Sequence, residues 1–141
     1  MPSSTEKDTF LSDRICTGAM LVVGGRGFRF KVQREGQLWP AFVVRHSSGV
    51  AAYINRCSHL ALELDWSQGT FFDIDKASII CSTHGALYEA VTGECIGGPC
   101  AGKPLETIQV TENDRFILLT DRNYWLVYDS PEKNIFSENP K

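Results

Sequence analysis

The chain of 141 residues is long enough for one domain with its own hydrophobic core. Its composition, 43% hydrophobic and 22% charged residues, excludes a mostly disordered chain. A net charge of −3 provides no electrostatic attraction for non-specific binding to nucleic acid. We therefore expect a single compact domain whose partners are not nucleic acids.

The N-terminal sequence MPSSTEKDTFLSDR has no apolar segment of the kind found in export signals and no twin-arginine pair. Apolar runs such as AMLVV and YWLVY have the length of strands and are too short to cross a bilayer. These features predict a cytoplasmic protein without a membrane partner. In such a reducing compartment, five cysteines are better explained by metal binding or catalysis than by a disulfide framework.

Short β-prone runs separated by turn residues make up most of the chain. The first, FRFKV at residues 28–32, alternates apolar and basic residues with the period of a half-buried strand. Six further runs have the same character: residues 40–45, 49–55, 77–81, 107–110, 115–120 and 124–128. Since no segment carries a long apolar stripe at helical spacing, we predict an all-β domain, an antiparallel sandwich or small barrel.

Cysteine and histidine occur together in CSHL, with Cys57 and His59, and again in CSTHG, with Cys81 and His84. Each pair is close enough to lie on one loop, so two loops could enclose a metal centre with two thiolates and two imidazoles. A structural zinc site uses the same ligands, but zinc motifs usually pair Cys with Cys and His with His. Here each loop mixes the two types. This order suits a two-iron centre in which one iron takes both thiolates and the other both imidazoles.

The two motifs resemble the Cys-x-His and Cys-x-x-His-Gly pair of Rieske proteins, which hold a two-iron, two-sulfide cluster. Asn55, TGEC at residues 92–95, GGP at 97–99 and KPLETIQV at 103–110 also match the family, whose proline loop covers the cluster. The resemblance spans residues 15–119. It implies one 2Fe-2S cluster in a subdomain of two loops plus a covering proline loop, with these ligands: Cys57 and Cys81 to the inner iron, His59 and His84 to the outer iron.

With this resemblance, the chain divides into a polar N-terminal segment at residues 1–14, a Rieske domain at 15–120 and a C-terminal extension at 121–141. The extension is interpreted either as a docking element or as an extra edge strand.

The resemblance also identifies residues expected around the cluster. High-potential respiratory members have a serine directly after the His-Gly and a tyrosine two places later, both donating to sulfur; this chain has Ala86 and Tyr88. Their two bridging cysteines are replaced by Leu62 and Thr83. The loss of one donor implies a potential below the top of the roughly −150 to +300 mV range of Rieske centres. Tyr88 could alternatively be an ordinary strand-face aromatic. The other expected neighbours are Leu60, Gly85, Gly98 and Pro99.

Three cysteines and one histidine remain outside the ligand set. Cys95 and Cys100 flank IGGP in the proline loop, where they could form a local disulfide or influence the cluster, but we expect two small, partly buried thiols. Cys16 carries no functional signal, and His46 beside SSG is expected in a surface loop.

The remaining residues predict a carrier, with no catalytic residue of its own. Rieske oxygenases add a mononuclear iron site with two further histidines and a carboxylate, whereas only His46 is left here. We therefore predict a Rieske-type ferredoxin that passes single electrons from a reductase to an oxygenase or another redox enzyme. Two alternatives stay open: a small subunit of a larger, nitrite-reductase-like enzyme, and a structural zinc-binding interaction module.

Four acidic residues lie between the two motifs, and they could form a rim that docks a basic partner surface. The alternative is an ordinary solvated loop. The four residues are Glu63, Asp65, Asp73 and Asp75.

Overall fold

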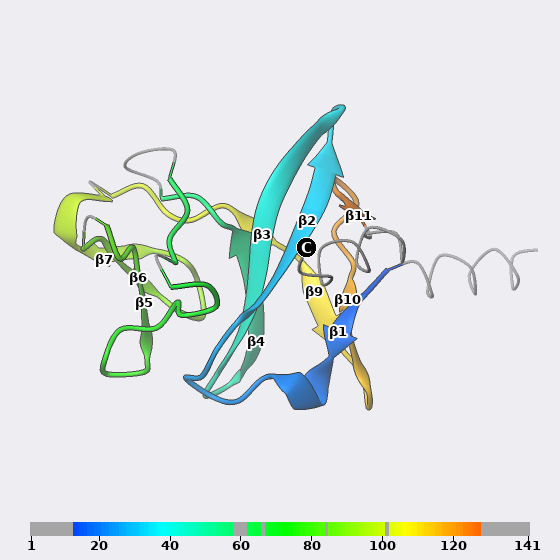
Figure 1. Ribbon diagram of the computed structural model, residues 1–141, viewed down its shortest axis with the longest axis horizontal. Helices are drawn as coiled ribbons and strands as arrows, with labels where there is room; N and C mark the ends of the chain where they lie inside the picture. The colour runs from blue at the N-terminus through cyan, green and yellow to red at the C-terminus, as the bar shows by residue number, and fades with distance from the viewer. Residues whose placement is uncertain (1–12, 58–61, 66, 84, 101, 128–141) are drawn as a thin grey trace, which may run out of the picture.

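The computed structural model describes residues 13–57, 62–65, 67–83, 85–100 and 102–127. Within these residues, short strands form three antiparallel sheets (Figure 1), which we call basal, central and distal. The basal sheet has the order β1-β10-β9, with β1 at Arg14–Thr17, β10 at Phe116–Leu119 and β9 at Val110–Glu112. The central sheet has the order β11-β2-β3-β4-β8: Trp125–Val127, Phe28–Arg34, Gln37–His46, Gly49–Ile54 and Thr107–Ile108. The distal sheet has the order β5-β6-β7: Ser78–Ile80, Leu87–Glu89 and Cys95–Gly97.

Two short 3₁₀ helices complete the described structure: η1 at Gly18–Met20 and η2 at Gly98–Cys100. None of the helices in the described ranges is long and apolar enough to span a membrane.

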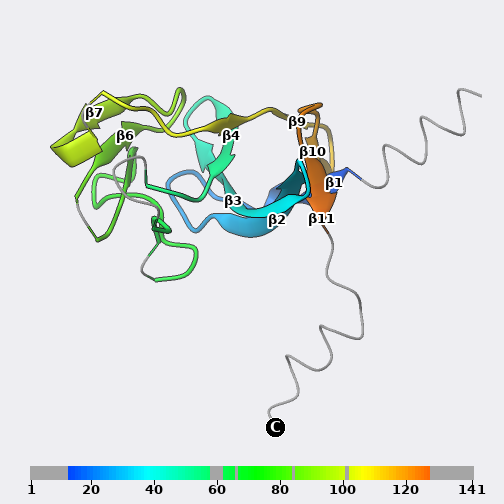
Figure 2. The same cartoon turned by 90° about the horizontal axis from the view of Figure 1, so that it is seen from above.

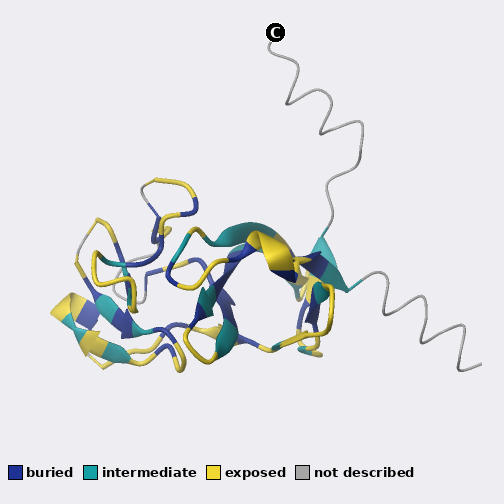
Figure 3. Ribbon diagram, turned by 90° about the horizontal axis from the view of Figure 1, so that it is seen from below, coloured by how far each residue is buried: buried dark blue, intermediate teal, exposed yellow. Residues whose placement is uncertain are grey.

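The central sheet is the middle layer, as the view from above shows (Figure 2). Its strands β3 and β4 contribute buried residues to a core on each face. Along β3, Phe42 and Val44 pack into the core shared with the distal sheet, whereas Ala41 and Val43 pack into the core shared with the basal sheet. Successive side chains of a strand point to opposite faces, so a strand covered on both sides needs apolar residues at every position. This explains the uninterrupted apolar run in β3 and its neighbour β4. In Figure 3 the buried residues concentrate in these strands and the exposed ones in the outer loops.

The all-β antiparallel fold predicted from the sequence is confirmed, with one run divided. TIQV forms two strands: Thr107–Ile108 pairs with β4 of the central sheet, and β9 from Val110 pairs with β10 of the basal sheet. Gln109 lies at the corner, where its N–H donates to Asp121 Oδ2 and its carbonyl accepts from the N–H groups of Thr120 and Asp121. The chain therefore changes sheets at Gln109 without leaving its backbone groups unpaired.

The C-terminal strand β11 pairs antiparallel with β2 and lies at the edge of the central sheet. Residues 125–127 of the predicted extension thus form an edge strand. Residues 1–12 and 128–141 lie outside the described residues.

The connections at the distal end form three loops that matter for function. We call residues 57–62, which follow β4, the first loop; residues 81–86, between β5 and β6, the second loop; and residues 95–100, which include β7 and η2, the proline loop. Figure 1 places the distal strands at the end of the molecule opposite the basal sheet.

Candidate metal centre

Each of the first two loops begins at a buried cysteine. Cys57 is 1% exposed and Cys81 is fully buried, and both belong to one apolar cluster. The loops are closed in the same way: Cys57 N–H donates to Leu62 O at 2.7 Å, and Cys81 N–H donates to Ala86 O at 2.9 Å. In both cases the chain returns to its cysteine after five residues. The backbone thus builds two matching loops, each with a cysteine at its base.

A hydrogen bond joins the second loop to the segment that follows the first. Ser82 N–H donates to Leu64 O at 3.0 Å. Within the second loop, Gly85 N–H donates to Cys81 O at 2.8 Å, and Gly85 has a φ of 78°, a conformation that favours glycine. The predicted ligands His59 and His84, together with Leu60, lie outside the described residues.

Tyr88, on β6, points its hydroxyl toward a cysteine of this pair. Its side chain is fully buried, and its Oη lies 3.7 Å from Cys57 Sγ. At this separation, the Tyr88 hydroxyl can donate a weak hydrogen bond to the sulfur. Ala86, the position where a second donor would stand in the respiratory proteins, is also fully buried, but its methyl side chain has no donor.

The proline loop packs its backbone directly against the second loop. A Cβ atom on Gly98 would lie 2.5 Å from Gly85 O and 2.9 Å from Ala86 Cα, so this approach requires glycine. Gly98 also has a φ of 75°. Pro99 follows it on the exposed side of the loop. The proline loop therefore covers the second loop at close range.

Cys95 and Cys100 form a disulfide across the proline loop, with their Cα atoms 5.9 Å apart. The expectation of two separate thiols is therefore wrong. It rested on the reducing environment, whereas the tight turn over Gly98 brings the two cysteines within bonding range. A spacing of five residues in sequence cannot reveal this, because the approach depends on the positive φ of the intervening glycine.

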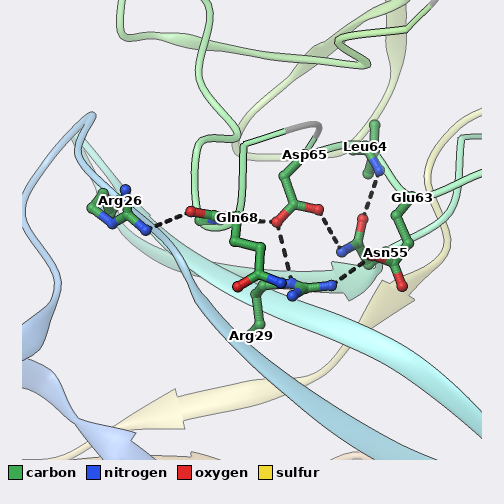
Figure 4. Close-up of polar contacts among 8 residues, drawn as sticks. Arg26, Arg29, Asn55, Glu63, Leu64, Asp65 and Gln68 are labelled. Atoms are coloured by element: carbon green, nitrogen blue, oxygen red, sulfur yellow. Dashed lines mark hydrogen bonds and ion pairs between the residues drawn. The ribbon is translucent and has the colours of Figure 1, made fainter. Parts of the chain in front are cut away.

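A buried polar network joins the segment before the first loop to the segment after it (Figure 4). Asn55, 1% exposed, accepts from Leu64 N–H through Oδ1 at 2.8 Å and donates from Nδ2 to Asp65 Oδ1 at 2.9 Å. Asp65 Oδ2 accepts from Gly69 N–H at 2.9 Å and lies 3.2 Å from Arg29 Nε. The Arg29–Asp65 contact is an ion pair and not a hydrogen bond, since Arg29 Nε has no hydrogen-bond partner. The side-chain carboxylate of Asp65 is thus buried and compensated.

Asp65 does not belong to the predicted acidic rim, because its side chain is buried. Its carboxylate accepts hydrogen bonds from Asn55 and Gly69 and forms an ion pair with Arg29. Glu63 is exposed and pairs with Arg29 Nη2 at 2.6 Å, which offsets its charge. Asp73 and Asp75 lie in a turn farther along the chain, where Asp75 accepts from the N–H groups of Ala77 and Ser78. These bonds hold the pKa of Asp75 below its usual range, so this exposed carboxylate stays ionised.

His46 and Cys16 lie away from the loops. His46 ends β3 and is only 8% exposed, contrary to the expected surface position, because its Nδ1 accepts from Ser48 N–H at 3.0 Å inside the turn that follows. Cys16 is buried in the basal core, and burial raises the pKa of its thiol to about 11.

Sequence reasoning missed two residues near the metal centre: Arg29, which it assigned only to a strand, and Asp65, which it placed on the surface. A basic residue in an alternating strand gives no sign that a carboxylate 36 positions later will meet it.

The sequence and the fold of the chain are similar to those of known proteins. The model of the Rieske [2Fe-2S] domain matches residues 19–121. Among solved structures, the ferredoxin of carbazole 1,9a-dioxygenase from Nocardioides aromaticivorans IC177 is similar, with 27% identity and a TM-score of 0.60 over 77% of this chain and 96% of that one. No curated protein matches the chain significantly.

Two further structures show the same fold. A Sphingomonas yanoikuyae B1 ferredoxin is 24% identical, with a TM-score of 0.56 over 75% of this chain and 94% of its own. The terminal oxygenase of the Nocardioides carbazole 1,9a-dioxygenase is 13% identical, with a TM-score of 0.56 over 84% of this chain but 31% of its own. Because the family model covers most of the sequence, the chain belongs to the Rieske family, whose members bind a 2Fe-2S cluster.

Proposed function

We propose that this chain is a Rieske-type ferredoxin that carries single electrons between a reductase and an oxygenase or another redox enzyme. The observation that carries the proposal is the pair of buried cysteines, Cys57 and Cys81, at the bases of two matching loops. The Ser82–Leu64 hydrogen bond ties the second loop to the segment that follows the first. In this proposal these cysteines supply thiolates to the inner iron. His59 and His84, from the same loops, supply imidazoles to the outer iron.

The residues present fit such a cluster. Two cysteines buried in one apolar cluster are a poor place for bare thiolates, since a buried charge is costly unless it is paired or binds a metal. When bound, the cluster supplies a centre that accepts and releases one electron at a potential set by hydrogen bonds to sulfur and by solvent exposure. The Tyr88 hydroxyl can donate a hydrogen bond to Cys57 Sγ, whereas the Ala86 side chain has no donor. This pattern supports a low to intermediate potential.

The extent of the structural matches supports a carrier. The chain corresponds to 96% of the Nocardioides ferredoxin but to 31% of the terminal oxygenase. Among the described residues, His46 is the only histidine, and it lies in a turn contact with Ser48. The resemblance therefore covers nearly the whole of the ferredoxin and about a third of the oxygenase, which supports the carrier proposal.

For partner docking, we propose that the carboxylates of half-buried Asp73 and exposed Asp75, with exposed Glu63, steer a basic partner surface. Exposed charges accelerate encounter more than they increase affinity, and salt screens them. If the proposal holds, Asp73→Lys/Asp75→Lys flattens the salt dependence of the electron-transfer rate. An unchanged dependence refutes this docking mode without affecting the carrier proposal.

The carrier proposal is tested by turnover. The purified protein, supplied with a flavin reductase and NADH, is expected to reduce a one-electron acceptor such as cytochrome c at a rate proportional to its concentration. Cys81→Ser should abolish this activity, while Cys16→Ala, in the basal core, should retain it. A protein that purifies in fixed stoichiometry with a large enzyme subunit would instead favour the subunit alternative. A Cys81→Ser protein with full activity would refute the proposal.

A further inference from the structure

The proline loop is closed by the Cys95–Cys100 disulfide, whose two ends pack against the same apolar cluster but differ in their exposure to solvent. Cys95 is half-buried at the start of β7. Cys100 is 1% exposed and packs in the same apolar cluster as Cys57 and Cys81. The disulfide thus connects a residue that solvent reaches with one in the wall of the metal centre.

We propose that Cys95–Cys100 is a second redox centre of this protein, a two-electron thiol–disulfide site that a dithiol reductant opens, releasing the proline loop from the second loop. The effect on the cluster rests on the function proposed above. The disulfide chemistry itself does not.

The reaction balances with a dithiol as the only co-reactant. A thiolate of the dithiol attacks Cys95 Sγ, the S–S bond breaks, and Cys100 leaves as a thiolate that takes a proton from water. The second thiol of the reductant then displaces Cys95 from the mixed disulfide. The reductant ends as a disulfide, and this chain gains two electrons and two protons as two thiols. Attack falls on Cys95 because it is the more exposed of the two residues.

Carbonyl acceptors for the reduced thiols are already in place. Cys100 Sγ lies 3.1 Å from Gly97 O and 3.7 Å from Leu87 O, and Cys95 Sγ lies 3.8 Å from Gly97 O. A thiol at either position can therefore donate to a carbonyl without leaving a buried polar group unpaired. The disulfide also closes a very short ring, which constrains the unfolded chain less than a long one would. Both features fit a reversible site better than a general structural crosslink.

The disulfide is coupled to the metal centre through Gly98. This residue lies inside the disulfide ring, and its backbone touches Gly85 O, next to the predicted ligand His84. The disulfide joins the two ends of the loop that holds Gly98 in its positive-φ conformation. Opening it frees the loop to move away from Gly85 and Ala86. Solvent access and hydrogen bonding control the potential and persistence of an iron–sulfur cluster, so the thiol state would regulate the carrier.

The first test identifies the thiols in the intact protein. The purified holoprotein is incubated with reduced thioredoxin, and in parallel with dithiothreitol, under native conditions; it is then alkylated with iodoacetamide and mapped by mass spectrometry. We expect two newly alkylated residues, Cys95 and Cys100. Cys16 serves as the internal control and should stay unmodified, because it is buried in the basal core. If neither loop cysteine is alkylated, the disulfide is a structural crosslink and the proposal is overturned.

The second test measures the coupling by two independent readouts. Reduction is expected to increase hydrogen–deuterium exchange in residues 81–86 and to speed loss of the cluster absorbance to a chelator about tenfold. The double variant Cys95→Ser/Cys100→Ser should behave like the reduced protein and ignore thioredoxin, whereas Cys16→Ala should respond like the wild type. Alkylation without a change in exchange or chelation refutes the coupling. A protein without iron would refute the proposed function, while the alkylation and exchange measurements would still decide this proposal.

Discussion

Asn55 donates its side-chain N–H to the carboxylate of Asp65 at 2.9 Å, and both residues are buried. The same amide accepts from Leu64 N–H, and Leu64 O in turn accepts from Ser82 N–H of the second loop. One side chain thus fixes the residue that connects the two loops. We therefore expect the geometry of the predicted metal centre to depend on these polar contacts as well as on its ligands.

Replacing Asn55 with leucine should destabilise the protein strongly. Asn55→Leu keeps the branched skeleton of the side chain but leaves Leu64 N–H and Asp65 Oδ1 without their buried partner, which costs about 3 kcal/mol of unfolding free energy. Urea unfolding followed by circular dichroism measures it. Asn113→Leu is the matched control, since the Asn113 side chain also makes two hydrogen bonds, both accepted by Oδ1 from backbone N–H groups, but in an exposed turn. If the two variants cost the same, the network does not support the loops as described.

Adding a methyl group to Gly98 should release the cluster. Gly98→Ala places a Cβ 2.5 Å from Gly85 O and imposes a φ of 75° on alanine. The proline loop must then shift, and we expect about tenfold faster loss of the cluster to a chelator, equivalent to roughly 1.4 kcal/mol.

Two nearby glycines serve as controls that distinguish contact with the second loop from backbone strain. Gly97→Ala meets only Leu87, at 3.6 Å, and should be neutral. Gly102→Ala meets no atom within 4 Å but has a φ of 76°, so it isolates backbone strain. Equal cluster loss in Gly98→Ala and Gly102→Ala would show that contact with the second loop is irrelevant.

Removal of the Tyr88 hydroxyl should lower the reduction potential. A donor near Cys57 Sγ stabilises the reduced, more negative centre, so Tyr88→Phe loses about 1 kcal/mol of that stabilisation, or about 40 mV for one electron. Tyr53→Phe is the control, because Tyr53 is equally buried but donates to Ala90 O at 2.8 Å. Redox titration followed by absorbance compares them. A potential unchanged in Tyr88→Phe would mean that the hydroxyl does not act on the sulfur.

The Arg45–Glu112 pair should make stability depend on pH. Arg45 Nη2 lies 2.6 Å from Glu112 Oε2, linking the central and basal sheets, and this bond holds the pKa of Glu112 below its ordinary value of 4.5. A carboxyl with a lowered pKa in the fold stabilises it above the unfolded-state pKa and loses this contribution as pH falls through the folded value. We therefore expect Glu112→Gln to cost about 1 kcal/mol at pH 7, discounted for partial exposure.

That cost should fade as the pH falls below 4.5, since the wild-type carboxyl also becomes neutral there. Asp114→Asn, an exposed turn residue, serves as control and should show no such dependence. Thermal unfolding at a series of pH values measures the difference. A cost that persists unchanged in acid would contradict an electrostatic origin.

The sequence predicted the parts of this protein that depend on local pattern. The β-prone runs at residues 40–45 and 49–55 predicted strands, and the structure explains why their apolar positions are consecutive, since both faces of these strands are buried. The short spacing within each Cys/His motif predicted two loops. In the described part of the chain, Cys57 and Cys81 indeed begin them.

The features that were missed depend on contacts between distant segments or on backbone conformation. Asp65 looked like a surface acid because its partners, Asn55 and Arg29, are recognisable only after folding. The Cys95–Cys100 disulfide depends on the positive φ of Gly98, which a glycine permits but does not impose. Long-range partners and the sign of φ are therefore what the sequence alone could not provide.

Electron paramagnetic resonance of the dithionite-reduced protein, with iron and zinc quantified on the same sample, tests the central claim most directly. A Rieske ferredoxin predicts about two irons per chain and the rhombic spectrum of a cluster with mixed cysteine and histidine ligands. Both should be lost in Cys57→Ser and retained in Cys16→Ala. A silent sample that holds stoichiometric zinc after anaerobic purification from iron-replete cells would contradict the account and indicate a structural zinc module.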